Sequence, residues 1–414
     1  MVWKQGAAVA IWGSGLNAEK VYVKYAGKYD IRIVVDNFKN KDNVFNKKIV
    51  SAEEFFATQE YNGLKIIIAS DKWKEISEQL KEKGLRAGED FLPYIMLNAQ
   101  NIEIKQVLEL CKTDEIENFI ECMKQSRKMA IFWGNCQING ITEFCLHNEE
   151  FDRKFMVLCF PNLWCTKQLL EVCDCEAIWK KCDLLVVQKI RTDNYMGIQV
   201  SDEYRCKYVL NLNGNCKIVK VPNLHFSGYY PQVVKEDRKA LTEIHWEGVH
   251  CYDGNIFQMT DQGMSEEEIV AQIEKEDFYS EEYVKDFFET QLNNIKEYEN
   301  DCDVKIADYL NKDKILYYSP MHPHVEVVRE VAIRTLKCLC IGDVQIKEQE
   351  RLEYHLEKKH YFHRTEYIYP SVLKALNIQN YKDEHRVNTY LFDKTISGRE
   401  LLNIYIAVCK GYKE

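Results

Sequence analysis

The sequence predicts an α/β protein with two parallel-sheet domains, and three observations support this fold class. Short apolar runs alternate with helical patterns along most of the chain, as they do where helices cover both faces of a parallel sheet. Glycine-containing turns follow two of these runs, at residues 13–18 and 134–137. The length of 414 residues is enough for two or three domains. We therefore expect a small Rossmann-like domain followed by a larger three-layer α/β domain.

The small domain is expected over residues 1–97 and begins with a dinucleotide-binding pattern. Gly13 and Gly15 follow the first apolar strand and fit the motif G-x-G-x-x-A. Such glycines let the main chain approach a phosphate at the N-terminus of the next helix. The second strand ends at Asp36, where an acidic side chain can bind a ribose. These three residues are the candidate ligand site of this domain.

Only half of a dinucleotide-binding fold is expected here. The apolar runs that predict its strands lie at residues 7–12, 31–35, 64–69 and 91–97. The second half of the fold, which would hold a nicotinamide, is missing from this pattern. Three alternatives therefore stay open for this domain: a nucleotide or nucleotide-sugar, a dinucleotide, or no ligand.

Residues 98–126 have helical apolar spacing and are expected to form connecting helices. The larger domain is expected over residues 127–340, with an acidic helical insertion at about 262–310. The tail, residues 341–414, is expected to pack on that domain. The predicted strands of the larger domain are residues 129–133, 155–160, 183–188, 217–221 and 314–318, and the predicted helices are residues 138–147, 166–172, 201–208 and 325–336.

Composition excludes several functions. The formal net charge is −10 with both signs interspersed, which argues against non-specific nucleic-acid binding. No run of about eighteen apolar residues exists, so no transmembrane helix is expected. The N-terminus lacks the pattern of a signal peptide, and we expect a cytoplasmic protein. The sixteen cysteines include no Cys-x-x-Cys pair, so we expect free thiols and no metal site.

Three polar loops follow predicted strands and should meet at one edge of the sheet. They are residues 134–137, 188–191 and 319–323. The carboxyl ends of parallel strands share an edge, and open α/β sheets bind their ligands there. A fourth loop, residues 222–231, is rich in aromatic residues and is expected to lie over the other three.

The loops carry a candidate nucleophile and a candidate base. Cys136 stands at a predicted helix N-terminus, where the helix dipole stabilises a thiolate. The main-chain N–H groups of this turn, with the side chains of Asn135 and Gln137, would form an oxyanion hole. His322 would activate either Cys136 or a substrate hydroxyl. The alternatives are a buried structural thiol for Cys136 and a helix-capping role for His322.

The candidate nucleophile follows the first strand of the larger domain, and His322-Pro323 precedes its last helix. This layout resembles that of SGNH (GDSL-like) hydrolases and acyltransferases. It is most similar to the acetyltransferase family of capsular polysaccharide biosynthesis typified by WcbI. The resemblance covers about residues 129–340. The small domain resembles those that precede other sugar-modifying enzymes, some of which hold a nucleotide-sugar. The matching pieces are Gly134-Asn135-Cys136-Gln137, Gln188, Pro222-Asn223, Phe226-Ser227-Gly228-Tyr229, Pro231 and His322-Pro323.

The resemblance implies an SGNH-like domain that binds coenzyme A and transfers an acetyl group from acetyl-CoA to a sugar or polysaccharide hydroxyl. It also implies association with other polysaccharide biosynthesis enzymes. Cys136, His322, Asn135 and Gln137 are the expected catalytic residues. Arg191 and Lys189 are placed by position alone near the CoA phosphates. The residues expected to bind substrate or CoA are Gly134, Gln188, Arg191, Asn223, Ser227 and Tyr229.

Two departures from the hydrolase pattern leave the mechanism open. Cys136 stands where hydrolases carry a serine, and Ser319 stands where they carry an aspartate. Either Cys136 becomes acetylated, or its turn only cradles the thioester while His322 activates the sugar. Two alternative functions also stay open: a non-catalytic sugar-nucleotide or CoA-binding module, and a thioesterase or esterase.

Overall fold

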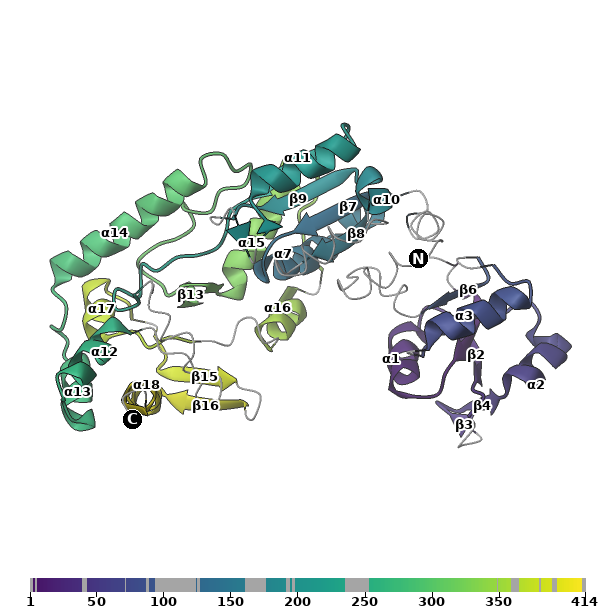
Figure 1. Ribbon diagram of the computed structural model, residues 1–414, viewed down its shortest axis with the longest axis horizontal. Helices are drawn as coiled ribbons and strands as arrows, with labels where there is room; N and C mark the ends of the chain where they lie inside the picture. The colour runs from purple at the N-terminus through teal and green to yellow at the C-terminus, as the bar shows by residue number, and fades with distance from the viewer. Residues whose placement is uncertain are drawn as a thin grey trace. The chain divides into compact units, whose positions relative to one another are not determined.

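The α/β class expected from the sequence is confirmed by the computed structural model (Figure 1). The chain divides into two compact units. The first contains Met1–Trp133, Asp152–Leu185 and Asn194–Ile218, and the second contains Gly134–Phe151, Val186–Asp193 and Val219–Glu414. The described residues are 3, 6–38, 43–70, 72–86, 89–93, 124, 127–160, 176–190, 194–195, 198–234, 253–347, 349–358, 365–379, 381–388 and 393–411.

The N-terminal part contains a six-stranded sheet of order β3-β4-β2-β1-β5-β6. Five of its strands are parallel, and β3 is antiparallel to β4 at the edge. The parallel strands follow the order 3-2-1-4-5 of a Rossmann fold. The strands are β1 (Ala8–Trp12), β2 (Asp30–Val35), β3 (Asn43–Val44), β4 (Lys47–Val50), β5 (Lys65–Ile68) and β6 (Phe91–Pro93).

This sheet is larger than the sequence predicted, because the β3–β4 hairpin was missed. Of the six residues of that hairpin, only Val44, Ile49 and Val50 are apolar, which is too few for a strand pattern. The other four strands were predicted. The helices of this part are α1 (Leu16–Tyr25), α2 (Ala52–Ala57), the short 3-10 turn Gln59–Tyr61 and α3 (Trp73–Glu82).

The central sheet of the larger α/β domain has the order β12-β9-β7-β8. Its strands are β7 (Lys128–Trp133), β8 (Phe155–Phe160), β9 (Leu184–Gln188) and β12 (Lys217–Val221). All four were predicted from apolar runs, and β7 pairs with β8 in parallel register. A two-stranded ladder joins β10 (Asn194–Tyr195) to β11 (Ile198–Gln199).

The prediction of a fifth sheet strand at residues 314–318 is wrong. Instead, β13 (Tyr317–Ser319) turns at once and pairs with β14 (His322–Pro323) in an antiparallel hairpin. A hairpin needs only a local turn, whereas joining a parallel sheet needs a long crossover. The loop that carries His322 is therefore the tip of a hairpin and not the end of a sheet strand.

Helices accompany the central sheet as expected. They are α7 (Gln137–Leu146), α8 (Glu149–Lys154), α10 (Glu176–Lys180), α11 (Asp202–Leu212) and α15 (Val325–Cys338). Helices α7 and α15 pack against each other through largely apolar buried faces. The helices predicted at residues 166–172 and 98–126 lie outside the described residues, apart from Lys124.

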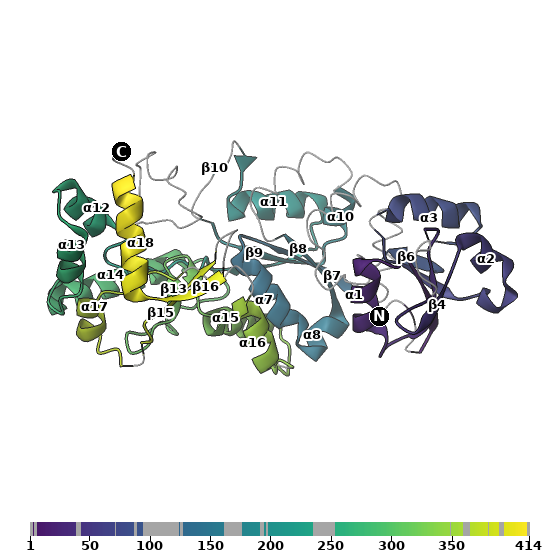
Figure 2. The same ribbon diagram turned by 90° about the horizontal axis from the view of Figure 1, so that it is seen from below.

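Two helices, α13 (Glu266–Ile273) and α14 (Glu281–Tyr298), lie within the range expected for the helical insertion, and α12 (Gly254–Asp261) precedes them. Side chains of Asp253, Ser265 and Ser280 cap these three helices at their N-termini. The tail contributes α16 (Gln349–Lys358), α17 (Pro370–Ala375), the antiparallel pair β15 (Glu384–Asn388) and β16 (Asp393–Ser397), and α18 (Gly398–Gly411). Helix α18 packs against α12 and α13 (Figure 2), and α17 packs against α14.

In the part of the chain that the structure describes, every cysteine is a free thiol. No group of three or more His, Cys, Asp and Glu side chains in that part has the arrangement to hold a metal ion. None of its helices combines the length and the apolar character that crossing a membrane requires.

Candidate active site

A tight turn carries Cys136 from the end of β7 into α7. Cys136 occupies the N-cap position of α7 and is half-buried. Gly134 is required by close packing, because a Cβ atom there would lie 2.6 Å from Oε1 of Gln188. The residues of the site, from Gly134 onward, belong to the second compact unit. Strand β7, this turn and α7 form the predicted strand-turn-helix, with the thiol at a helix N-terminus.

A buried pair of glutamine side chains holds the loops of the site together. Nε2 of Gln188 donates to Oε1 of Gln137 at 2.8 Å. Nε2 of Gln137 donates to the carbonyl oxygens of Leu224, at 3.0 Å, and Met321, at 2.8 Å. Oε1 of Gln137 also accepts from the N–H of Leu224 at 3.0 Å. The Gln137 amide thus makes four hydrogen bonds, its full capacity.

The hydrogen bonds of this pair change the expected oxyanion hole. Both hydrogens of the Gln137 amide are already donated to main-chain carbonyls, so Gln137 positions loops instead of donating to an oxyanion. The N–H of Asn135 donates to Oε1 of Gln188, and the N–H of Gln137 donates to Oδ1 of Asn135, both at 2.9 Å. Nδ2 of Asn135 lies 3.5 Å from Oδ1 of Asn223. A hydrogen bond of this length is weak. Nδ2 of Asn135 is therefore the side-chain group of the turn that could donate to an oxyanion.

His322 has a partner of its own in the β13–β14 hairpin. Its Nδ1 lies 2.7 Å from Oγ of Ser319, which is buried. The preceding residue, Met321, accepts the bond from Gln137, the residue after Cys136. One hydrogen bond therefore joins the chain neighbour of Cys136 to the chain neighbour of His322.

The nearby His324 has a structural role. Its ring packs against that of Tyr318 in a tilted arrangement, with centroids 4.0 Å apart. Burial, followed by the nearby charge of Lys314, lowers the pKa of His324 to about 4. The imidazole is therefore neutral at physiological pH and serves packing at the start of α15.

The loop at residues 222–231 is fastened tightly next to the turn. The N–H of Phe226 donates to the carbonyl of Pro320 at 2.8 Å. The Tyr229 hydroxyl contacts the carbonyls of Asn311 and Lys314 at 2.7 and 2.8 Å, and its ring is fully buried. Burial raises the pKa of Tyr229. Tyr229, an expected ligand-binding residue, thus contributes packing and not an accessible surface.

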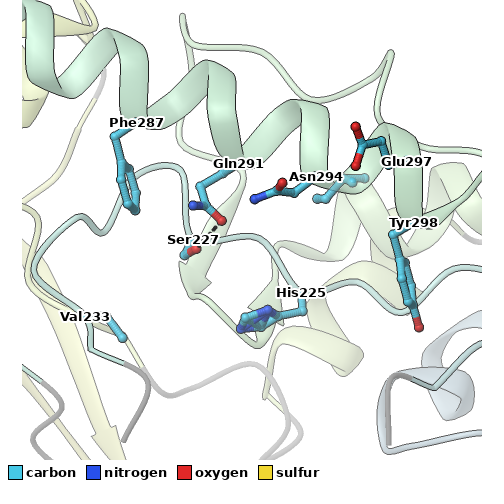
Figure 3. Close-up of a pocket in the computed structure, with 9 residues that line it drawn as sticks. His225, Ser227, Val233, Phe287, Gln291, Asn294, Glu297 and Tyr298 are labelled. Carbon is cyan, nitrogen blue, oxygen red and sulfur yellow. Dashed lines mark hydrogen bonds between the residues drawn. The ribbon is translucent and has the colours of Figure 1, made fainter.

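Ser227, another expected binding residue, lines a hollow between this loop and α14 (Figure 3). The cavity volume is about 580 Å³. Oγ of Ser227 donates to Oε1 of Gln291 across it at 3.0 Å. The α14 side is lined by Gln291, Asn294 and Glu297, which were not predicted as site residues. Their spacing of three residues along a helix was the available signal.

Lys189 and Arg191 were the candidates for binding the CoA phosphates. Nζ of Lys189 donates to the carbonyl of Tyr298 at 2.7 Å and lies 4.6 Å from the centre of its ring. Lys189 also forms an ion pair with Asp301. Arg191 lies outside the described residues.

The N-terminal candidates lie together at one edge of their own sheet. Gly13 has φ +118° and Gly15 is the N-cap of α1. Oδ2 of Asp36 accepts from the N–H of Ser14 at 3.0 Å and from the Ser14 hydroxyl. Oδ1 of Asp36 accepts from the N–H of Phe38 at 2.9 Å. The carboxylate that was expected to bind a ribose therefore holds the glycine turn.

Comparisons with known proteins agree with this architecture. Residues 129–342, more than half of the chain, match the family model described as polysaccharide biosynthesis enzyme WcbI. A solved structure of WcbI, described as a novel polysaccharide biosynthesis enzyme, is similar with a TM-score of 0.54 and 18% identity. The match covers 69% of this chain and 90% of that one. That structure is the native protein without a disulfide bond between coenzyme A and one of its cysteines. No curated protein matches the sequence.

Proposed function

The chain belongs to the WcbI family of polysaccharide biosynthesis enzymes, and we propose that it is a coenzyme A-dependent acyltransferase acting on a sugar hydroxyl. One observation carries the proposal. The bond from Gln137 to Met321 brings the Cys136 turn next to the hairpin in which Ser319 contacts His322. A thiol at a helix N-terminus beside an oriented imidazole suits acyl transfer.

The proposed donor is acetyl-CoA. The similar WcbI structure is described by reference to a disulfide bond between CoA and a cysteine. Such a bond joins the CoA sulfur directly to a cysteine sulfur. If Cys136 is the equivalent cysteine, the thioester sulfur of acetyl-CoA would reach this turn. The acetyl carbonyl would then lie within reach of Cys136 and of the side-chain amide of Asn135.

In the covalent route, the thiolate of Cys136 attacks the acetyl carbonyl and the bond to the CoA sulfur breaks. CoA leaves as a thiolate and takes up a proton. The sugar hydroxyl then attacks the Cys136 thioester and gives its proton to Nε2 of His322. Cys136 leaves as a thiolate, and the imidazolium of His322 releases a proton that replaces the one taken up by CoA, so the products are the sugar acetate ester and CoA.

In the direct route, the sugar hydroxyl gives its proton to Nε2 of His322 as its oxygen attacks acetyl-CoA. The bond to the CoA sulfur breaks, and the CoA thiolate takes the proton from the imidazolium. Asn135 Nδ2 would stabilise the negative charge that develops on the carbonyl oxygen. Both routes use the tautomer with the proton on Nδ1 pointing at Ser319 Oγ, which makes Nε2 the basic atom.

The test compares acetyl-CoA turnover with sugar acceptors in the wild type and in Cys136→Ala and His322→Ala. We expect His322→Ala to lose at least about a hundredfold in rate, because general base catalysis contributes that much. Full activity in both variants would overturn the assignment of the site. Mass spectrometry separates the routes, because only the covalent route places an acetyl group on Cys136.

A further inference from the structure

We propose that the hollow between α14 and residues 225–233 is the acceptor subsite, and that it takes the uncharged rings of a saccharide. The proposal rests on the proposed acyl transfer for its role. Its binding chemistry follows from the lining residues alone, which Figure 3 shows on both walls of the hollow.

Two amide side chains lie between two aromatic rings along one wall. Phe287, Gln291, Asn294 and Tyr298 line it from a single helix, at intervals of three or four residues. They form a continuous stripe on one side of α14. From Phe287 to Tyr298 the stripe spans about 16 Å, at about 1.5 Å per residue. This length of helix exceeds that of one pyranose ring.

The lining has hydrogen-bonding capacity that the protein does not use. Oε1 of Gln291 is bonded to Ser227, but among the described residues nothing pairs with Nε2 of Gln291. In the same described part, the Asn294 side-chain amide makes no hydrogen bond. In Figure 3, the Gln291 and Asn294 side chains extend from α14 toward the loop that carries His225. Amides both donate and accept, as neighbouring sugar hydroxyls require.

Charge argues against a phosphate ligand in this hollow. None of the nine lining residues is lysine or arginine, and Glu297 is an exposed carboxylate. Phosphate groups are bound by cations or by clustered main-chain N–H groups. The nucleotide end of CoA therefore does not suit this surface, whereas uncharged hydroxyls do.

The loop that lines one wall of the hollow is also bonded to the proposed reaction centre. His225 lines the hollow, and its neighbour Leu224 exchanges two hydrogen bonds with the side chain of Gln137. Asn223 lies against Asn135. A saccharide along α14 would therefore contact the loop that is bonded to the Cys136 turn.

The experiment measures binding by saturation-transfer NMR with methyl glycosides of glucose, galactose, mannose and N-acetylglucosamine. We expect Asn294→Ala and Gln291→Ala to weaken glycoside binding about tenfold, the effect of losing one or two hydrogen bonds. Asn293→Ala is the matched control, since Asn293 is an exposed neighbour on α14 outside the hollow. It should bind as the wild type does. The CoA dissociation constant should be unchanged in all three variants.

Three results would overturn the subsite: no glycoside binds the wild type, Asn293→Ala weakens binding as much as Asn294→Ala, or Asn294→Ala weakens CoA instead. Because this assay needs no turnover, it separates the two proposals. Glycoside binding that depends on Asn294, without acetyl transfer, supports the subsite and rejects the transferase. Acetyl transfer with an acceptor KM unchanged in Asn294→Ala supports the transferase and rejects the subsite.

Discussion

Oγ of Ser319 lies 2.7 Å from Nδ1 of His322, so a serine occupies the place where the hydrolase pattern has a carboxylate. A hydroxyl can fix the orientation and tautomer of an imidazole, as a carboxylate does. It cannot provide the negative charge that stabilises an imidazolium. The Ser319–His322 pair therefore suits a general base whose imidazole must be oriented but is protonated only briefly during the reaction.

Removing the Ser319 hydroxyl should slow acyl transfer by about tenfold, because His322 loses its orientation while remaining present. Ser319→Ala is compared with Ser319→Asp, in which a carboxylate again accepts from Nδ1. We expect Ser319→Asp to recover activity and to shift the acidic limb of the pH–rate profile to higher pH, since a nearby negative charge raises the pKa of an imidazole that must be unprotonated to act as a base. Equal rates in all three proteins would show that Ser319 does not orient His322.

Gln137→Ala should destabilise the protein by about 3–5 kcal/mol. The substitution leaves several buried polar groups without the Gln137 amide as partner, including the carbonyl and the N–H of Leu224, and each unsatisfied group costs about 1–3 kcal/mol. Urea unfolding measures the change. Gln262→Ala, at an exposed position after α12, is the matched control and should change stability by less than about 0.5 kcal/mol. Similar values for both variants would contradict the holding role of Gln137.

Stability should fall in mild acid because of His324. Burial holds the pKa of His324 at about 4 in the folded protein, below about 6.5 in the unfolded chain. Between these values the unfolded state binds more protons, so the free energy of unfolding decreases as the pH drops from about 6.5 to about 4. The full effect is about 3 kcal/mol, or somewhat less because the side chain is partly exposed.

The variant His324→Phe isolates this contribution, since it keeps a ring on Tyr318 and cannot titrate. Asp253 acts in the opposite direction, because burial raises its pKa to about 6. The measured quantity is therefore the difference between wild type and variant in urea unfolding at pH 7 and pH 5. A difference that does not change with pH would refute the prediction.

Gly13→Ala should destabilise the N-terminal sheet by about 1–3 kcal/mol. The added Cβ would lie 2.7 Å from the carbonyl oxygen of Ala69, and the φ of +118° is strained for any residue with a side chain. Gly27→Ala is the control, since nothing lies within 4 Å of its Cβ position and its φ lies outside that region. Thermal unfolding of both variants should show a loss for Gly13→Ala only.

Strands with long apolar runs were predictable from the sequence, as β7, β8 and β9 show. The strand β4 was not, because Ile49 and Val50 alone cannot produce a strand pattern. The β13–β14 hairpin was taken for a sheet strand, since an apolar run does not reveal its pairing partner. Sequence patterns give the type of an element more readily than its neighbours.

The candidate site was predictable in its residue types but not in their roles. Cys136 and His322 were expected in loops that meet, and one hydrogen bond joins their chain neighbours. The role of Gln137 depends on the carbonyls of Leu224 and Met321, which lie 87 and 184 positions away in the sequence. Only a folded chain brings main-chain groups that distant to one amide.

The glutamine pair has a consequence for amide hydrogen exchange. The N–H groups of Asn135 and Leu224 both donate to this pair, one to Gln188 and the other to Gln137. Each N–H can exchange only when its bond to a glutamine oxygen breaks, and the two glutamines are themselves joined by a hydrogen bond. These amides, from distant parts of the sequence, should therefore lose protection in a single opening event and exchange with one shared rate.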